Sequence, residues 1–362
     1  MNHGTTTAVS RPGTPGTTVP SPATGASGGA AAGRKRAAWL LAAVVVLAIL
    51  AATSLAVGAR GLPLGTVLEA FTRFDPANGD HAVVHARIPR TVLGLLAGGA
   101  LGLAGAAMQG VARNPLADPG IMGVNAGAAL AVVTGIYVFG IASFSGYVWF
   151  AFLGAAVAAV VVYLIASLGR DGATPVKLAL AGAALSAGLF SLMNVILVSS
   201  QDTLDRFRFW QVGGVAGRDW SVVLPGLPFL AVGAAIVLLT GRILNSLALG
   251  DDIARGLGQR VGVTRAVTAL GIVLLCGTAT ALAGPIGFVG LVIPHAVRFL
   301  TGPDYRWILP FSLVLAPVLL LGADIIGRVV LLPGEVPAGI MTALIGAPVF
   351  VWLVRRGKGA GL

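Results

Sequence analysis

The regular spacing of small residues in residues 91–111 limits what this chain can fold into more than any other sequence feature. Glycine or alanine recurs there at every fourth position, namely at Gly94, Gly98, Gly102, Ala106 and Gly110. Residues four apart share one helix face, and a face of glycine and alanine lets another helix approach closely, as helices do in lipid. In a soluble helix each glycine would cost about 0.8–1 kcal/mol relative to alanine. The spacing therefore predicts a tightly packed membrane helix.

A short polar turn follows this helix. Residues 113–120 read RNPLADPG, and an apolar run resumes directly after them. Two prolines and an asparagine favour a rigid turn. A turn this polar and rigid is more than a simple connection between two spans requires, so we expect it to have a function.

The composition places the chain among membrane proteins. Of its 362 residues 56% are hydrophobic and only 10% are charged, whereas soluble domains carry about 25% charged residues. A full membrane span needs ~20 apolar residues. The ten predicted spans are 37–58, 91–111, 120–140, 147–168, 177–198, 221–241, 266–284, 286–300, 308–328 and 338–355. The eighth is short, and a Gly-Pro pair breaks the chain before it, as in the broken helices of transporters.

The sequence divides into three parts. Residues 1–36 are a predicted disordered cytoplasmic tail, because they are rich in small and polar residues and end in a basic cluster. Residues 37–356 are the predicted ten-helix membrane domain, and residues 357–362 are a short cytoplasmic tail. The first apolar run resembles a signal peptide, but it is long enough to span and begins too far into the chain. We expect residues 59–90 to form a polar loop.

The topology explains the net charge of +11. With ten spans and a cytoplasmic N-terminus, sixteen of the 24 Lys and Arg residues fall on the cytoplasmic side, against five of the 13 Asp and Glu residues. Basic residues are retained on that side of a membrane. We therefore expect a multi-pass protein of the cell membrane with both termini in the cytoplasm. Membrane lipid is then its surroundings, and no nucleic acid partner is needed.

The sequence contains no motif for ATP hydrolysis and none for a metal site. None of its three lysines lies in a glycine-rich phosphate loop. Cys276 is the only cysteine, and His81 and His85 have no accompanying carboxylate motif. We therefore expect no cofactor on this chain. Proton- or sodium-driven carriers bind the ion with ionisable groups inside the membrane, and the near absence of such groups in the spans argues against a carrier of that kind.

Residues 250–263, GDDIARGLGQRVGV, form an informative cytoplasmic loop. Apolar Ile253, Leu257 and Val261 stand between charged residues over about one short helix. Such a segment can lie on lipid, dock into a groove of another protein, or serve only as a solvated connection. Its glycines resemble a dinucleotide-binding motif but have the wrong spacing and no surrounding strand–helix–strand unit, so that interpretation is excluded.

Three arginines lie at the predicted outer edge of the membrane. Arg87 and Arg90 are at the outer end of the second span, and Arg328 is at the outer end of the ninth. Asp324 is one helical turn before Arg328 and can pair with it. Arginines at such positions either anchor the protein at the membrane interface or receive carboxylates of an external partner.

Four longer motifs stand in a fixed order along residues 37–356. They are RIPR at 87–90, GAAMQGVARNPLADPGIMGVNAGA at 105–128, GPIGFVGLVIPHAVRF at 284–299 and EVPAGIMTALIGAPVFVWL at 335–353. In this set and order the sequence resembles the permease subunit of the ABC importers for ferric siderophores, haem and cobalamin.

The resemblance implies a fold and a set of partners. The fold is all-α with about ten transmembrane helices, and the permease forms a dimer with a second copy or a paralogue, with the pathway at the dimer interface. Two cytoplasmic ATPase subunits use ATP and Mg²⁺ to drive it, and an extracytoplasmic substrate-binding protein docks on the outside. The chain itself is then a transporter subunit and not an enzyme.

The resemblance also implies roles for individual residues. Arg87, Arg90 and Arg328 match arginines that meet glutamates of the binding protein. The residues that match a cytoplasmic gate are Asn114 and Leu116, with Thr174 and Pro175 from the loop before the fifth span. The residues that match the ATPase-coupling helix are Asp251, Asp252, Ala254, Arg255, Leu257 and Gly258. The predicted packing residues, Gly94, Gly98, Gly102 and Gly110, follow from the four-residue spacing described above and not from the resemblance.

These observations favour a permease that imports a ferric siderophore. Import of haem or cobalamin by the same family is an alternative, and a secondary carrier without an ATPase is an alternative of another class. The near absence of charge in the spans suits a wide, weakly interacting cavity for a large chelate.

Overall fold

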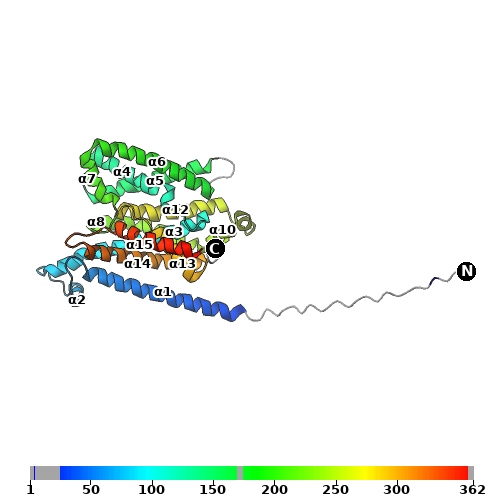
Figure 1. The fold of residues 1–362 in the computed structure, drawn as a ribbon, viewed down its shortest axis with the longest axis horizontal. Coiled ribbons are helices and arrows are strands. Elements are labelled where there is room, and N and C mark those ends of the chain that lie inside the picture. Colours follow the sequence, from blue (N-terminus) through cyan, green and yellow to red (C-terminus); the bar gives the residue numbers. More distant parts are fainter. Residues whose placement is uncertain (1–3, 5–24, 169–173, 358–362) are drawn as a thin grey trace. The chain divides into compact units, whose positions relative to one another are not determined.

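Helices make up the secondary structure of the part of the chain that the computed structural model describes, which is residue 4, residues 25–168 and residues 174–357 (Figure 1). Most of the predicted N-terminal tail, the residues just before Thr174 and the predicted C-terminal tail after residue 357 lie outside the described residues. By its internal contacts the chain divides into two units, Met1–Trp39 and Leu40–Leu362. The second unit holds the features discussed below.

Each of the ten predicted spans corresponds to an apolar helix. Within the described residues, eight segments are long and apolar enough to cross a membrane, and two apolar helices are shorter. The long ones are α1 (Gly25–Ala56), α3 (Gly79–Ala112), α5 (Phe144–Ser167), α6 (Pro175–Ser199), α8 with η2 and α9 (Trp220–Val223, Leu224–Gly226, Leu227–Leu239), α12 (Val261–Ala283), α14 (Tyr305–Val330) and α15 (Ala338–Gly357). The shorter ones are α4 (Val124–Phe139) and α13 (Val289–Thr301). The predicted all-α membrane fold is therefore confirmed.

The prediction that residues 59–90 form a polar loop was wrong. Helix α2 (Leu64–Thr72) lies in this stretch, and α3 begins at Gly79. Asn78 caps α3 by accepting a hydrogen bond from the backbone N–H of Asp80, and Pro89 is accommodated inside the helix. Caps of this kind stabilise a helix start without adding apolar residues, so hydropathy alone does not reveal them.

Three further short helices join the spans. Helix α7 (Gln201–Gln211) is polar and is capped by Ser200, whose side chain accepts a hydrogen bond from Thr203. Helices α10 (Gly241–Ala248) and α11 (Asp251–Gly256) connect α9 to α12. Because these helices contain several polar residues, they are not among the ten predicted spans.

Helix α3 is the centre of the second unit. Nearly all of its residues from Thr91 to Val111 are buried, and it packs against α12, α13 and α14 (Figure 1). A helix that is apolar on all sides belongs in an interior. The residues of α3 are also small, so several helices can surround it at once.

The glycine face of α3 lies against α14. The four predicted packing glycines, Gly94, Gly98, Gly102 and Gly110, all contact residues of that helix. A Cβ atom added at Gly98 would lie 2.6 Å from the Cα of Pro317, and one added at Gly102 would lie 2.4 Å from the backbone oxygen of Ser312. Only glycine allows two helix backbones to approach this closely.

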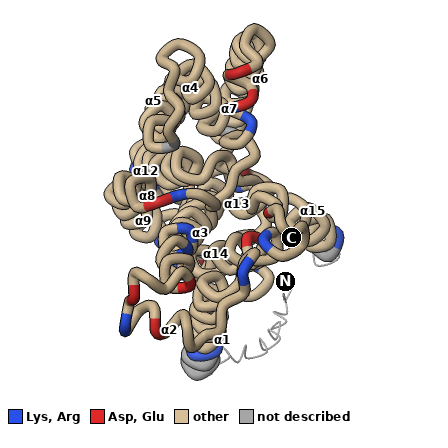
Figure 2. The backbone as a smooth tube through the Cα atoms, turned by 90° about the vertical axis from the view of Figure 1, so that its left-hand side faces the viewer, with Lys and Arg blue, Asp and Glu red and all other residues tan. Residues whose placement is uncertain are grey.

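Charged residues lie mostly in the loops and at the helix ends, and few lie along the helices (Figure 2). The end of the second unit that carries α2 holds Arg87, Arg90 and Arg328, and we call it the α2 end. The opposite end, where α3 finishes, holds Arg113 and Asp251, and we call it the α11 end. The distribution of basic residues predicts that the α11 end is cytoplasmic.

Candidate functional site

The loop with the predicted gate residues Asn114 and Leu116, residues 113–118, follows α3 at the α11 end, and we call it the gate loop after that prediction. Arg113 ends the helix in the left-handed conformation with φ at 50°, which non-glycine residues adopt infrequently. Asn114 Oδ1 accepts a hydrogen bond from the backbone N–H of Leu116 at 2.9 Å. This bond fixes the turn while both side chains stay exposed, with Leu116 at 51%. The loop therefore presents its two predicted gate residues outward on a rigid support.

Asp118 joins the gate loop to the short helix η1 (Pro119–Met122). Its Oδ1 accepts a hydrogen bond from the backbone N–H of Gly120 at 2.7 Å. Burial raises the pKa of the Asp118 carboxyl above its ordinary value, and the bond from Gly120 only partly opposes this effect. The junction thus contains a carboxyl group whose charged form is destabilised by burial.

Thr174 and Pro175 form the start of α6. Thr174 Oγ1 accepts a hydrogen bond from the backbone N–H of Lys177 at 3.3 Å, and Pro175 occupies the first helical position. A threonine cap followed by proline is a favourable helix start, so both residues have a structural reason for their positions. Their part in a gate stays a prediction.

The segment predicted to couple to the ATPase, residues 250–263, contains α11 and leads into α12, and we call it the coupling segment after that prediction. Gly250 separates α10 from α11 at φ 121°, a conformation that glycine adopts without strain. An exposed apolar row runs along the segment and the residue before it, formed by Leu249, Ile253 and Leu257. Large apolar side chains exposed together at a polar loop are typical of a contact surface.

The predicted coupling residues divide into an outward and an inward set. Asp252 is 97% exposed and pairs with Arg255 at 2.9 Å, and Leu257 is 63% exposed. Ala254, in contrast, is fully buried, so a partner cannot reach it in this structure. Asp251 is turned inward and forms ion pairs within the chain. Gly258 lies just after the C-cap of α11 at φ 82°, and its backbone N–H donates to the carbonyl of Arg255 at 2.9 Å, so its contribution is to the backbone turn.

The arginine cluster at the α2 end is built around a buried carboxylate. Arg90 binds Asp324 through two hydrogen bonds of 2.8 and 3.1 Å, and its third nitrogen lies 2.7 Å from Glu335. Arg328 also binds Asp324, as the spacing of four residues predicted. Two guanidinium groups therefore neutralise one carboxylate that is only 1% exposed.

Two arginines of the cluster also hold the end of α1. Arg328 donates to the backbone oxygens of Ser54 and Val57, at 2.6 and 3.0 Å. Arg87 donates to those of Leu55 and Ala56, at 2.9 and 3.0 Å. The last carbonyl groups of a helix lack partners within it and favour positive charge. These arginines therefore satisfy the C-terminal turn of α1.

This arrangement does not agree with the predicted docking role of Arg328. Its side chain is 1% exposed and its donors are used within the chain, so an external carboxylate cannot reach it in this structure. Arg87 and Arg90 are partly exposed, and their docking role stays a prediction. Glu335, which the sequence did not single out, is the most accessible member of the group at 34%.

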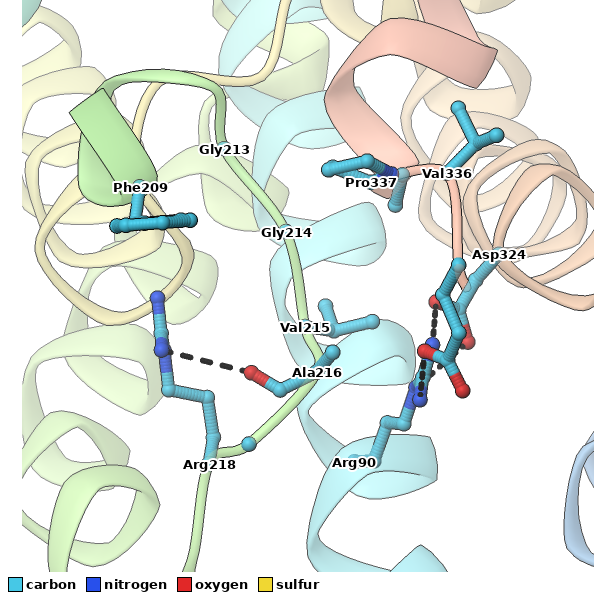
Figure 3. Close-up of a pocket in the computed structure, with 13 residues that line it drawn as sticks. Arg90, Phe209, Gly213, Gly214, Val215, Ala216, Arg218, Asp324, Val336 and Pro337 are labelled. Atoms are coloured by element: carbon cyan, nitrogen blue, oxygen red, sulfur yellow. Dashed lines mark hydrogen bonds and ion pairs between the residues drawn. The ribbon is translucent and has the colours of Figure 1, made fainter. Parts of the chain in front are cut away.

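A cavity of about 290 Å³ adjoins the arginine cluster. Figure 3 shows Arg90 and Arg218 on opposite sides of the loop that runs from Gly213 to Ala216, with Phe209 next to Arg218. Burial lowers the pKa of Arg218 to about 10. Ligand cavities usually measure 300–1,000 Å³, so this one is at the lower limit and does not suit a large chelate.

Comparison with known proteins assigns the chain to a family. The model of the FecCD transport family matches residues 45–356, which is the whole of the predicted membrane domain apart from its first residues. This chain belongs to the FecCD transport family. It is therefore a transporter permease, and ATP hydrolysis resides in other subunits of the importer.

Relatives of this FecCD permease match it over most of their length. It is 50% identical over 313 residues to the ferric enterobactin transport system permease of Escherichia coli, covering 86% of this chain and 92% of that protein. It is 44% identical over 311 residues to the iron(3+)-hydroxamate import system permease of Bacillus subtilis, covering 86% and 81%.

A solved structure supports the same conclusion. An ABC transporter assigned to the metal-chelate type, in an inward-facing conformation, superposes with a TM-score of 0.77 at 28% identity, covering 88% of this chain and 99% of that one. Permeases of ABC importers in general work as dimers with ATPase and substrate-binding partners. The FecCD permease is thus a multi-pass membrane subunit of an ABC importer.

Proposed function

We propose that this FecCD permease carries ferric siderophores across the cell membrane. The identity of 50% to the ferric enterobactin permease, over nearly the whole membrane domain, is the observation that carries the proposal. A second relative is named for iron(3+)-hydroxamate. Both names describe bulky ferric complexes, and a pathway with few charged groups suits such a cargo because it binds the cargo weakly and releases it.

We infer that two ATPase subunits dock at the α11 end. The exposed row of Leu249, Ile253 and Leu257 offers an apolar helix face of the kind that inserts into a groove of a partner. The exposed pair Asp252 and Arg255 can provide polar contacts at the edge of that apolar face. ATP and Mg²⁺ are used by these subunits, and the permease binds neither.

The transport mechanism we propose is alternating access. Closure of the ATPases on ATP moves the α11 end, and the helices reorient against one another. The glycine contacts between α3 and α14 provide smooth surfaces for such movement, because they lack interlocking side chains. The gate loop then opens or closes the cytoplasmic side of a pathway shared with a second permease, which is either a copy or a paralogue.

We infer that the external binding protein docks at the α2 end. Arg87 and Arg90 are the cluster arginines that an outside carboxylate can approach, because Arg328 is buried. Glu335 already occupies one nitrogen of Arg90, so an incoming carboxylate competes with it. If the α2 end faces outward and the chain has ten spans, both chain termini lie on the cytoplasmic side.

The proposal is tested by deleting the gene in a strain without other ferric siderophore permeases. We expect uptake of ferric enterobactin to be lost and to return with a plasmid copy of the gene. Undiminished ferric siderophore uptake would contradict the proposal. Loss of haem or cobalamin uptake with iron uptake intact would replace it with the alternative substrate.

A further inference from the structure

One carboxylate joins the coupling segment to the gate loop. Asp251, the first residue of α11, accepts hydrogen bonds on the same oxygen, Oδ1, from Arg113 and from Arg265. The bond from Arg265, in the first turns of α12, measures 2.9 Å. The end of α3 therefore meets the consecutive helices α11 and α12 at one side chain, although it lies 138 residues away in the sequence.

Arg113 spans the junction between α10 and α11. Its Nε donates to the backbone oxygen of Leu247 at 2.6 Å, before Gly250, and its Nη2 donates to Asp251, after Gly250. Gly250 is the residue at which the backbone can turn most freely. Arg113 thus holds both sides of this turn, and a rotation of α11 about Gly250 pulls on its guanidinium group.

Helix α10 does not follow such a rotation, because it is fixed to α14. Asn245 donates to Asp304 at 2.7 Å and accepts from the backbone N–H of Tyr305 at 2.8 Å. Movement of α11 against this fixed helix therefore reaches the gate loop through Asp251 and Arg113. Asn114 directly follows Arg113, and its side chain holds the backbone of Leu116.

The conformation of Arg113 supports a role for its side chain. The left-handed position that ends a helix is usually filled by glycine, and here it is filled by arginine at φ 50°. Its contacts on Leu247 and Asp251 account for an arginine at a position that glycine would fill more easily.

We propose that Asp251 is a positioning residue that transmits movement of the coupling helix α11 to the gate loop through Arg113. The proposal rests on the proposed function, since it assumes that an ATPase moves α11. It assigns Asp251 an internal task and leaves the ATPase contact to the exposed residues Ile253 and Leu257.

The proposal is tested with Asp251→Asn and Arg113→Gln in the permease reconstituted with its ATPase subunits and binding protein. Arg113 and Asp251 are 32% and 27% exposed, and partly exposed ion pairs add little to stability. Asparagine at position 251 keeps an oxygen that can accept from the more buried Arg265, so both variants are expected to fold and assemble. We expect ATP hydrolysis within about twofold of the wild type and uptake of ferric enterobactin reduced about tenfold. The double variant should transport no less than either single one, because the two residues act through one contact.

The matched control is Asp202→Asn, which removes the carboxylate of an exposed pair with Arg206 on α7, at the other end of the molecule. It should change neither hydrolysis nor uptake. Normal uptake by Asp251→Asn, or losses that add in the double variant, would overturn the proposal.

A second measurement does not depend on the cargo. A spin label is placed at Leu116→Cys in a Cys276→Ala background, and its mobility is compared before and after trapping with ATP and vanadate. We expect trapping to change the spectrum in the wild-type background and to leave it unchanged with Asp251→Asn. A full response with Asp251→Asn would overturn the proposed link. A wild-type response without ferric enterobactin uptake would count against the proposed function only.

Discussion

A buried arginine is tolerated in this protein because each of its contacts serves the fold. Arg328 neutralises Asp324 and donates to the last carbonyls of α1. Arginine suits this task because its planar group presents several donors in a fixed arrangement. The sequence showed that Arg328 could pair with Asp324, but not that α1 ends beside it, because that contact joins residues 274 positions apart.

We predict that Arg328→Ala lowers the free energy of unfolding by about 1–3 kcal/mol. Asp324 keeps Arg90 but loses its second guanidinium partner. The carbonyls of Ser54 and Val57 lose the donor that satisfies them. Thermal unfolding of the purified permease in detergent measures the effect. Arg206→Ala, which removes an exposed charge, should cost less than about 1 kcal/mol. Unchanged stability of Arg328→Ala together with weaker binding of the external protein would restore the docking role.

We predict that Asp118→Asn stabilises the protein at neutral pH. Burial raises the pKa of Asp118 in the folded state, so its charge destabilises the fold above that pKa, and the effect disappears as the pH falls through it. Asparagine keeps the oxygen that accepts the bond from Gly120. The melting temperature of the variant should exceed that of the wild type at neutral pH, and the difference should shrink toward the ordinary pKa of 3.8.

Asp219 provides a control of opposite sign. A hydrogen bond from Ser221 is the main cause that lowers the pKa of this exposed carboxyl, so its contribution is present at neutral pH and is lost as the pH falls through the lowered value. Asp219→Asn should therefore not stabilise the protein at neutral pH. Equal shifts for the two variants would contradict the assignment of Asp118 as a destabilising charge.

At the scale of the elements, sequence patterns revealed the apolar helices and missed short, partly polar ones. The four-residue spacing of glycine in α3 is visible in the sequence, and each glycine lies against α14. Helices α2 and α7 are short and partly polar, so they lack the apolar run that identifies a span. The inward direction of Asp251 and Ala254 depends on how α11 packs, which the sequence of residues 250–263 alone does not specify.

We predict that Gly102→Leu destabilises the α3–α14 contact. A side chain there meets the backbone of α14, and overpacking of this kind typically costs 1–3 kcal/mol or more. Gly188→Leu on α6 is the matched control, because nothing lies within 4 Å of its added Cβ. The yield of folded protein and its melting temperature should fall for Gly102→Leu alone, and equal behaviour of the two variants would contradict the close packing.

We predict that Leu257→Ser weakens capture of the ATPase subunits about tenfold or more, as expected for removal of a central apolar contact. Copurification of the subunits with the permease measures this effect. Leu64→Ser, which changes an equally exposed leucine on α2, should have no influence. Normal capture by Leu257→Ser would show that the apolar row faces lipid or water.

At the scale of the whole molecule, the ten spans and the family could both be predicted from the sequence. Long apolar runs are dictated by the thickness of the bilayer, and the motifs around residues 105–128 and 284–299 identify the family without a structure. The contacts that join the gate loop to the coupling segment could not be predicted, because Arg113, Asp251 and Arg265 meet only after α3, α11 and α12 have packed.

The central claim is that this FecCD permease moves a ferric siderophore only when a separate ATPase drives it. The most direct measurement is uptake of iron-labelled enterobactin into proteoliposomes that contain the permease with or without its ATPase subunits. We predict uptake only in the presence of the ATPase, ATP and the binding protein. Uptake by the permease alone, driven by a proton or sodium gradient, would contradict the account.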